Sequence, residues 1–186
     1  MAKAERRTVI LVDGENIDAT LGQTVLKRKP DPSERPRWDR LVDYAGRLWG
    51  QEVLGLFFLN ASNGHLPGPF ISALQGVGFR PVPLSGTADQ KVVDVGIQRT
   101  LDALADRPAD VLLVSHDGDF VEQIQRLVGG GHRVGMVGFP ELMSNGYSGL
   151  GVRMIDLETE VGAFNHPLPR VRIIPLTEFD PEVFLR

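Results

Sequence analysis

The 186-residue sequence contains no cysteine. A chain without thiols forms no disulfide bridge, no thiolate zinc site and no iron–sulfur cluster, and it has no cysteine nucleophile. It also lacks an excess of basic residues, because 24 acidic residues outnumber 20 lysines and arginines and give a net charge of −4. This balance excludes a protein that binds nucleic acid over its whole surface, but it is compatible with a local basic patch.

Long apolar runs are missing as well. No stretch approaches the roughly 18 residues that a membrane-spanning helix requires. The apolar residues 9–12 are followed at once by Asp13, which is too early for a signal peptide. We therefore expect a cytoplasmic protein with no membrane partner. A hydrophobic fraction of 42% and a charged fraction of 24% are typical of a globular domain.

Short apolar segments alternate with segments of helical period, a pattern typical of a parallel sheet covered by helices. It predicts strands at residues 8–12, 53–59, 79–84, 110–115 and 133–138, and a shorter sixth strand at 152–157. It predicts helices at residues 38–49, 69–77 and 120–128. A further helix is expected to begin at a capping box formed by Thr87 and Gln90 and to run to about residue 105. The sequence therefore predicts an α/β fold.

Two segments depart from this alternation. Residues 27–40 hold three prolines, six basic residues and three acidic ones, and their net charge of +3 favours an exposed loop. After residue 160 the alternation ends in a stretch with four prolines at positions 167, 169, 175 and 181. We therefore expect one domain over residues 1–160 and a proline-rich C-terminal arm over residues 161–186. Within the arm, the VRII stretch is interpreted as an edge strand or as a segment packed on the domain.

Acidic residues follow two of the predicted strands. Asp13 comes directly after the first strand, and Asp117 and Asp119 follow the strand that ends at Ser115. In open parallel sheets, ligands bind beyond the carboxyl ends of the strands. A fourth carboxylate, Asp94, lies among valines of the helix that follows the capping box. If the two strands are neighbours, we expect the four carboxylates to converge at one edge of the sheet.

Carboxylates that converge either keep a proton or recruit a cation. Oxygen ligands with no soft partner suit Mg²⁺ or Mn²⁺ rather than zinc. Asn16, three residues after Asp13, is placed to orient a ligand or a metal-bound water. The same pattern therefore predicts a magnesium or manganese site.

Each of these residues also has a purely structural interpretation. Asp13 and Asp117 are suited to turns or helix caps, and Asp119 to the positive end of a helix. Asp94 is spaced to pair with Lys91 within one helix turn. His116 is interpreted as a supporting loop residue rather than a metal ligand. It is the joint occurrence of the acidic residues at one sheet edge that favours a functional site.

Three blocks of sequence carry a resemblance to a known family: VDGEN after the first strand, K-x-x-D in the mid-chain helix and SHDGDF after a later strand. In this order they resemble the NYN domain of the PIN-like nuclease superfamily, within its bacterial LabA-like branch, over about residues 8–157. The resemblance implies a three-layer, Rossmann-like α/β/α sandwich around a mostly parallel sheet of five or six strands. It also implies a ribonuclease that depends on Mg²⁺ or Mn²⁺.

Carried over by position, the resemblance implies a catalytic and metal-binding cluster with two polar supports. The cluster is Asp13, Asp94, Asp117 and Asp119, and the supports are Asn16 and Ser115. Two positions depart from the family pattern. Relatives commonly carry a further Asp where this chain has Thr100, which weakens the case for a second metal site. They also tend to carry an Asp near Val152, a difference that we interpret as structural.

An acidic site repels RNA, so basic side chains are needed to hold the phosphate backbone. The candidates are Lys27, Arg28, Lys29, Arg35, Arg37, Lys91 and His116. The alternative for the basic segment is a solvated loop with no ligand. Two other functions are open: a non-catalytic RNA- or protein-binding module of the same fold, which Thr100 favours, and a small-molecule phosphohydrolase. RNA is the expected partner, and the sequence is also compatible with a homo-oligomer.

Overall fold

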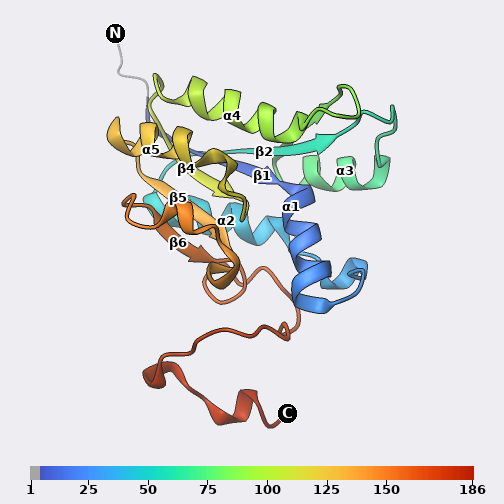
Figure 1. Cartoon of the computed structure of the whole chain (residues 1–186), viewed down its shortest axis with the longest axis vertical. Coiled ribbons are helices and arrows are strands. Elements are labelled where there is room, and N and C mark those ends of the chain that lie inside the picture. The colour runs from blue at the N-terminus through green and yellow to red at the C-terminus, as the bar shows by residue number, and fades with distance from the viewer. Residues whose placement is uncertain (1–4) are drawn as a thin grey trace.

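The computed structural model describes residues 5–186 and contains one six-stranded parallel sheet (Figure 1). The strands are β1 (Arg7–Asp13), β2 (Val53–Asn60), β3 (Phe79–Leu84), β4 (Ala109–Val114), β5 (Val134–Gly138) and β6 (Arg153–Asp156). Their order across the sheet is β3-β2-β1-β4-β5-β6, and every neighbouring pair is parallel. The predicted α/β fold is confirmed, and β1 and β4 are neighbours at the centre of the sheet.

Helices cover both faces of this sheet. They are α1 (Gly14–Ala19), α2 (Trp38–Trp49), α3 (Gly68–Gly76), α4 (Val92–Leu104) and α5 (Val121–Gly129). Helices α4 and α5 lie over one face, and α2 and α3 lie over the other (Figure 1). The three-layer α/β/α arrangement is therefore confirmed. The apolar stripe of α2 gives that helix the bounds that its sequence predicts, with Leu41 and Ala45 fully buried.

The central strands are apolar along their whole length because both of their faces are covered. In β1, Val9 and Leu11 pack beneath α4 and α5, whereas Ile10 and Val12 pack on the side of α2 and α3. Successive side chains of a strand point to opposite faces. Asp13, the next residue, is therefore directed to the side of α4 and α5.

Two helical segments differ from the prediction. The helix expected from Thr87 begins at Val92 instead. The Gln90 side chain accepts the Thr87 backbone N–H at 2.8 Å, but the Thr87 hydroxyl donates to the Asp89 carboxylate and caps no helix. The predicted capping box is therefore only half formed, and it closes a turn.

The second difference is a helical region that the sequence analysis missed. Helix α1 continues as a π-helix over Thr20–Leu26. Its sequence signal is an apolar residue at every fourth position, since Ile17, Leu21 and Val25 are all buried. Polar residues and a glycine separate its members, so the repeat is inconspicuous in the sequence.

The C-terminal segment packs on the domain for about ten residues and then leaves it. Val161 and Ala163 are buried, whereas Val171 and Ile173 are 94% and 95% exposed. Beyond Arg170 the chain runs away from the sheet and helices (Figure 1). The VRII stretch forms no strand, and two of its four residues are almost fully exposed. Within residues 5–186, no helix combines the length and the apolar character that crossing a membrane requires.

Candidate metal centre

The strand order brings the carboxyl ends of β1 and β4 together. Chain connections run outward in opposite directions from these two strands, and in such sheets ligands bind in the crevice at this point. Asp13 ends β1, and Ser115 follows β4. The Ser115 hydroxyl donates to Asp13 Oδ2 at 3.0 Å across 102 residues of sequence. The neighbouring strands that the sequence analysis required are therefore present.

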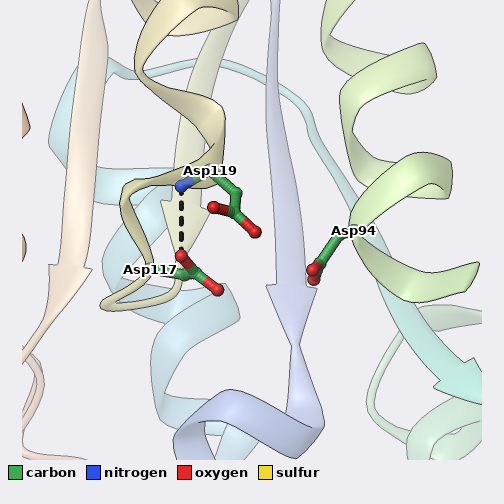
Figure 2. A group of neighbouring side chains, drawn as sticks. All are labelled: Asp94, Asp117 and Asp119. Carbon is green, nitrogen blue, oxygen red and sulfur yellow. Dashed lines mark hydrogen bonds between the residues drawn. The ribbon is translucent and has the colours of Figure 1, made fainter. Parts of the chain in front are cut away.

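Three carboxylates gather beside this point. Asp94 lies in the first turn of α4, and Asp117 and Asp119 lie in the segment after β4. Each offers one carboxylate oxygen, and these oxygens lie within 4.8 Å of one another. Figure 2 shows Asp94 directed from its helix toward Asp117 and Asp119. We call these three residues the aspartate trio.

Local structure holds the trio in place. Asp117 Oδ1 accepts the Asp119 backbone N–H at 3.1 Å and caps the short 3₁₀ helix Gly118–Phe120 (Figure 2). This bond uses one oxygen of Asp117. Asp117 therefore caps a helix, as its structural interpretation predicts. It also belongs to the acidic cluster that the functional interpretation predicts.

The surroundings of Asp94 disfavour its charged form. Burial raises the pKa of Asp94, the negative charge of Asp117 raises it further, and Lys91 partly offsets both effects. The Lys91 ammonium lies 3.2 Å from Asp119 Oδ2 and 3.7 Å from Asp94 Oδ2. Because the Lys91 side chain is 72% exposed, a better cation can replace its ammonium at little cost. The trio therefore attracts positive charge.

Asp13 lies beside the trio but is not one of its members. Its side chain is buried, and it accepts hydrogen bonds from the Ser115 hydroxyl and, at 3.3 Å, from the Asn16 backbone N–H. Burial raises the pKa of Asp13 to about 6, although the two hydrogen bonds act to lower it. The negative charges of Asp94 and Asp117 add to the rise. Asp13 thus places a fourth acidic group behind the trio, and it also caps α1.

His116 and Asn16 form a buried support next to this group. Asn16 Oδ1 accepts the His116 backbone N–H at 2.9 Å and lies 3.0 Å from Nδ1 of the ring. The Phe139 backbone N–H donates to Nε2 at 2.8 Å, so a neutral ring carries its proton on Nδ1 and donates it to Asn16. Burial lowers the pKa of His116 to about 4, which keeps the ring neutral at pH 7.

This geometry corrects one prediction. His116 is only 6% exposed and both of its ring nitrogens are engaged, so it has no free group for an RNA phosphate. The two donors from His116 also fix the orientation of Asn16, whose amide oxygen must face them. Within residues 5–186 the Asn16 NH₂ group has no hydrogen-bond acceptor, so it is available as a donor.

We expect Asn16→Ala to lower the free energy of unfolding by about 1–3 kcal/mol, because two His116 donors lose their acceptor. Urea unfolding measures this loss. Asn145→Ala, at an exposed site, is the matched control and is expected to change stability by less than about 0.5 kcal/mol. Equal losses in the two variants would contradict the supporting role of Asn16.

Half of the residues in the basic segment at residues 27–40 are exposed, and part of its charge is neutralised by ion pairs. Its ion pairs join Arg28 to Glu34 at 2.6 Å, Arg35 to Asp18 at 2.9 Å and Arg37 to Asp39 at 3.2 Å. Lys27 and Lys29 are exposed and form no ion pair within residues 5–186. The RNA contacts of this segment remain a prediction.

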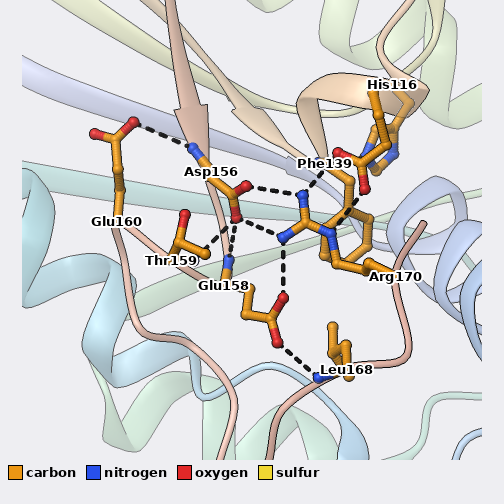
Figure 3. Close-up of polar contacts among 9 residues, drawn as sticks. His116, Phe139, Asp156, Glu158, Thr159, Glu160, Leu168 and Arg170 are labelled. Carbon is orange, nitrogen blue, oxygen red and sulfur yellow. Dashed lines mark hydrogen bonds and ion pairs between the residues drawn. The ribbon is translucent and has the colours of Figure 1, made fainter. Parts of the chain in front are cut away.

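One buried cation was missed by the sequence analysis. The Arg170 side chain is 3% exposed and forms ion pairs with Glu141, Asp156 and Glu158 (Figure 3). Its guanidinium also lies 4.8 Å from the ring centre of Phe139, the residue whose N–H binds His116. No sequence signal reveals this cluster, because its members come from separate turns that meet only in the folded chain.

Comparisons with known proteins agree with this fold. The model of the NYN domain matches residues 7–148. A crystal structure of a protein of unknown function from Vibrio parahaemolyticus is similar, with a TM-score of 0.67 and 22% identity over 86% of this chain and 98% of that one. This likeness shows the fold alone.

A second solved structure, a 3-dehydroquinate dehydratase-like protein from Bifidobacterium longum, aligns with 85% of this chain and 96% of its own. Its TM-score of 0.36 and its identity of 11% are too low to support any argument. No curated protein sequence matches the chain.

Proposed function

Because the chain belongs to the NYN domain family, we propose that it is a metal-dependent ribonuclease that hydrolyses phosphodiester bonds of RNA. The observation that carries this proposal is the aspartate trio at the carboxyl end of the central strands. All four predicted acidic residues lie inside the matched range. Three carboxylates whose oxygens lie within 4.8 Å of one another repel, and a bound cation would offset this repulsion.

The donor set fits a hard divalent cation. Asp94, Asp117 and Asp119 offer carboxylate oxygens only, which suits Mg²⁺ or Mn²⁺, and the charge of Asp13 behind them adds to the attraction. An ion held there would act as a Lewis acid that activates water and offsets the charge developing on the phosphate. Mg²⁺ keeps several waters, so three protein oxygens are sufficient.

The chain itself supplies donors for the RNA backbone at this site. The Lys91 ammonium lies at the edge of the trio and, once a cation neutralises Asp94 and Asp119, becomes available to a phosphate oxygen. The Asn16 NH₂ group would be a second donor. Lys27 and Lys29 extend the positive surface and would hold the strand without reading its sequence.

The test is a cleavage assay on single-stranded RNA with Mn²⁺, with Mg²⁺ and with excess chelator. We expect cleavage with either metal and none with chelator. Asp94→Asn is expected to weaken apparent metal affinity by roughly 10- to 100-fold, because one of three oxygen donors loses its charge. Asp102→Asn, on the exposed side of the same helix, is the matched control and is expected to cleave like the unmodified protein. Cleavage that persists in chelator would exclude a metal-dependent reaction.

One observation favours a second function. The Thr100 side chain, at the position where relatives commonly carry a further Asp, donates to the Gly96 carbonyl within α4 and takes no part in the trio. A site with fewer carboxylates is compatible with a non-catalytic RNA-binding module of the same fold. RNA that binds but stays intact with every metal would support this function instead.

A further inference from the structure

A hollow of about 680 Å³ opens on the face of the sheet that α2 and α3 cover. It is bounded by α1, the segment at residues 32–39, the end of β2 and α3. Its volume lies in the range of pockets that bind small organic ligands. Nothing in the proposed cleavage chemistry uses this hollow, since Asp94 approaches from the opposite face.

The floor of the hollow is aromatic. Trp38 and Phe70 both pack edge-to-face against Phe57, with ring centres 5.3 Å and 5.4 Å from it. Phe57 is buried, whereas Trp38 and Phe70 are only partly covered and line the open space. Such a floor favours a flat, apolar ligand.

The rim of the hollow is charged. Arg35 and Arg37 line it, with side chains 39% and 49% exposed, and each is held by a neighbouring carboxylate, Asp18 or Asp39. Guanidinium groups bind phosphate, and carboxylates accept hydrogen bonds from the amino groups of bases. A ligand that places a flat ring on the floor and an anion at the rim satisfies both parts.

The hollow and the aspartate trio flank the end of the same strand. Gly14 lines the hollow and directly follows Asp13, whose carboxylate faces the trio. An RNA strand that continues from the trio past the end of β1 would reach the hollow with a neighbouring nucleotide. Unpaired bases stacked on aromatic side chains are the usual means by which proteins recognise single-stranded RNA.

We propose that this hollow binds one unpaired nucleobase of the RNA strand next to the bond that is cleaved. The aromatic floor takes the base, and Arg35 and Arg37 take its phosphate. The inference rests on the proposed ribonuclease function, because that function puts an RNA strand at this edge of the sheet. It makes the hollow the place where substrate preference is set.

Trp38 provides a direct reporter. The sequence has two tryptophans, so Trp49→Phe leaves Trp38 as the sole one. Trp49 lies at the far end of α2 beneath Arg133, away from the hollow. Short single-stranded oligonucleotides of each base are titrated in chelator, so that binding is measured without cleavage. We expect a saturable change in Trp38 emission. Phe70→Ala is expected to weaken binding by roughly 5- to 150-fold, the range for loss of one base-stacking side chain.

Phe70→Leu tests the same contact with the apolar volume retained, and Phe184→Leu, in the exposed C-terminal arm, is the matched control. We expect weaker oligonucleotide binding in Phe70→Leu and unchanged binding in Phe184→Leu. The thermal shift produced by Mn²⁺ is expected to be the same in both, because neither residue touches the trio. A lower affinity together with a normal metal response separates this role from general destabilisation.

The outcomes distinguish the two proposals. Trp38 emission that no oligonucleotide changes, in a protein that still cleaves RNA with Mn²⁺, would overturn the base site and leave the ribonuclease intact. A response to a proline-rich peptide but to no oligonucleotide would overturn it as well. Base binding without cleavage under any metal would support the hollow and refute the ribonuclease.

Discussion

Asp117→Asn is expected to lower the rate of RNA cleavage by about 10³-fold, because removing one negative oxygen donor forfeits several kcal/mol of transition-state stabilisation. Asparagine is the informative replacement. Its side-chain oxygen still accepts the Asp119 N–H that Asp117 Oδ1 now accepts at 3.1 Å. The cap of the segment after β4 is therefore kept, and only the charge is lost. Single-turnover cleavage with saturating Mn²⁺ measures the effect.

The same variant is expected to be more stable than the unmodified protein when no metal is present. Removing the charge relieves the repulsion that raises the pKa of Asp94, and we expect a gain of roughly 0.5–2 kcal/mol. Mn²⁺ should raise the melting temperature of the unmodified protein and have little effect on Asp117→Asn. Asp102→Asn is again the control. An Asp117→Asn protein that still cleaves RNA at the normal rate and is less stable without metal would refute the metal site.

Arg170→Met is expected to produce the largest loss of stability of any substitution discussed here. The guanidinium is buried and pairs with Glu141, Asp156 and Glu158, whose side chains are 19%, 12% and 18% exposed. Removing one partner of a buried ion pair costs about 3–5 kcal/mol, because the remaining charges are left unpaired. We expect about 3 kcal/mol, since the three carboxylates keep some contact with water. Urea unfolding at pH 7 measures the loss.

This loss should depend on pH with a definite sign. Burial acts to raise the pKa of Asp156 and of Glu141, but hydrogen bonds from Arg170 outweigh it and hold both pKa values below their usual range. Stability gained from a lowered pKa is present above the unfolded value of about 4 and is lost as the pH falls through the folded value. The difference between the unmodified protein and Arg170→Met should therefore be largest near neutral pH and shrink below about pH 4.

The matched control is Arg172→Met, two residues along the same segment. Arg172 forms no ion pair within the part of the chain that the structure describes. We expect a change of less than about 0.5 kcal/mol. A loss in the control as large as that of Arg170→Met would show that the segment, rather than the buried charge, is responsible.

Much of the fold follows from local sequence. The buried strands are apolar at successive positions, and the stripe of α2 repeats at helical spacing, so both can be recognised without tertiary contacts. The acidic residues after β1 and β4 were found in the same way, because strand ends and ligand sites coincide in this type of sheet. The predicted start of α4 was wrong because the Thr87 hydroxyl bonds to the Asp89 carboxylate and does not cap the helix.

Periodicity and the position of carboxylates at strand ends thus determined the α/β class and the candidate acidic residues, since both depend on neighbours in the chain. Only the tertiary structure decided that Asp94 joins Asp117 and Asp119 while Asp13 lies behind them. The burial of His116, the ion pairs of Arg170 and the aromatic hollow were likewise not foreseeable. Each depends on side chains from distant segments, and a one-dimensional pattern contains no information on how those segments pack.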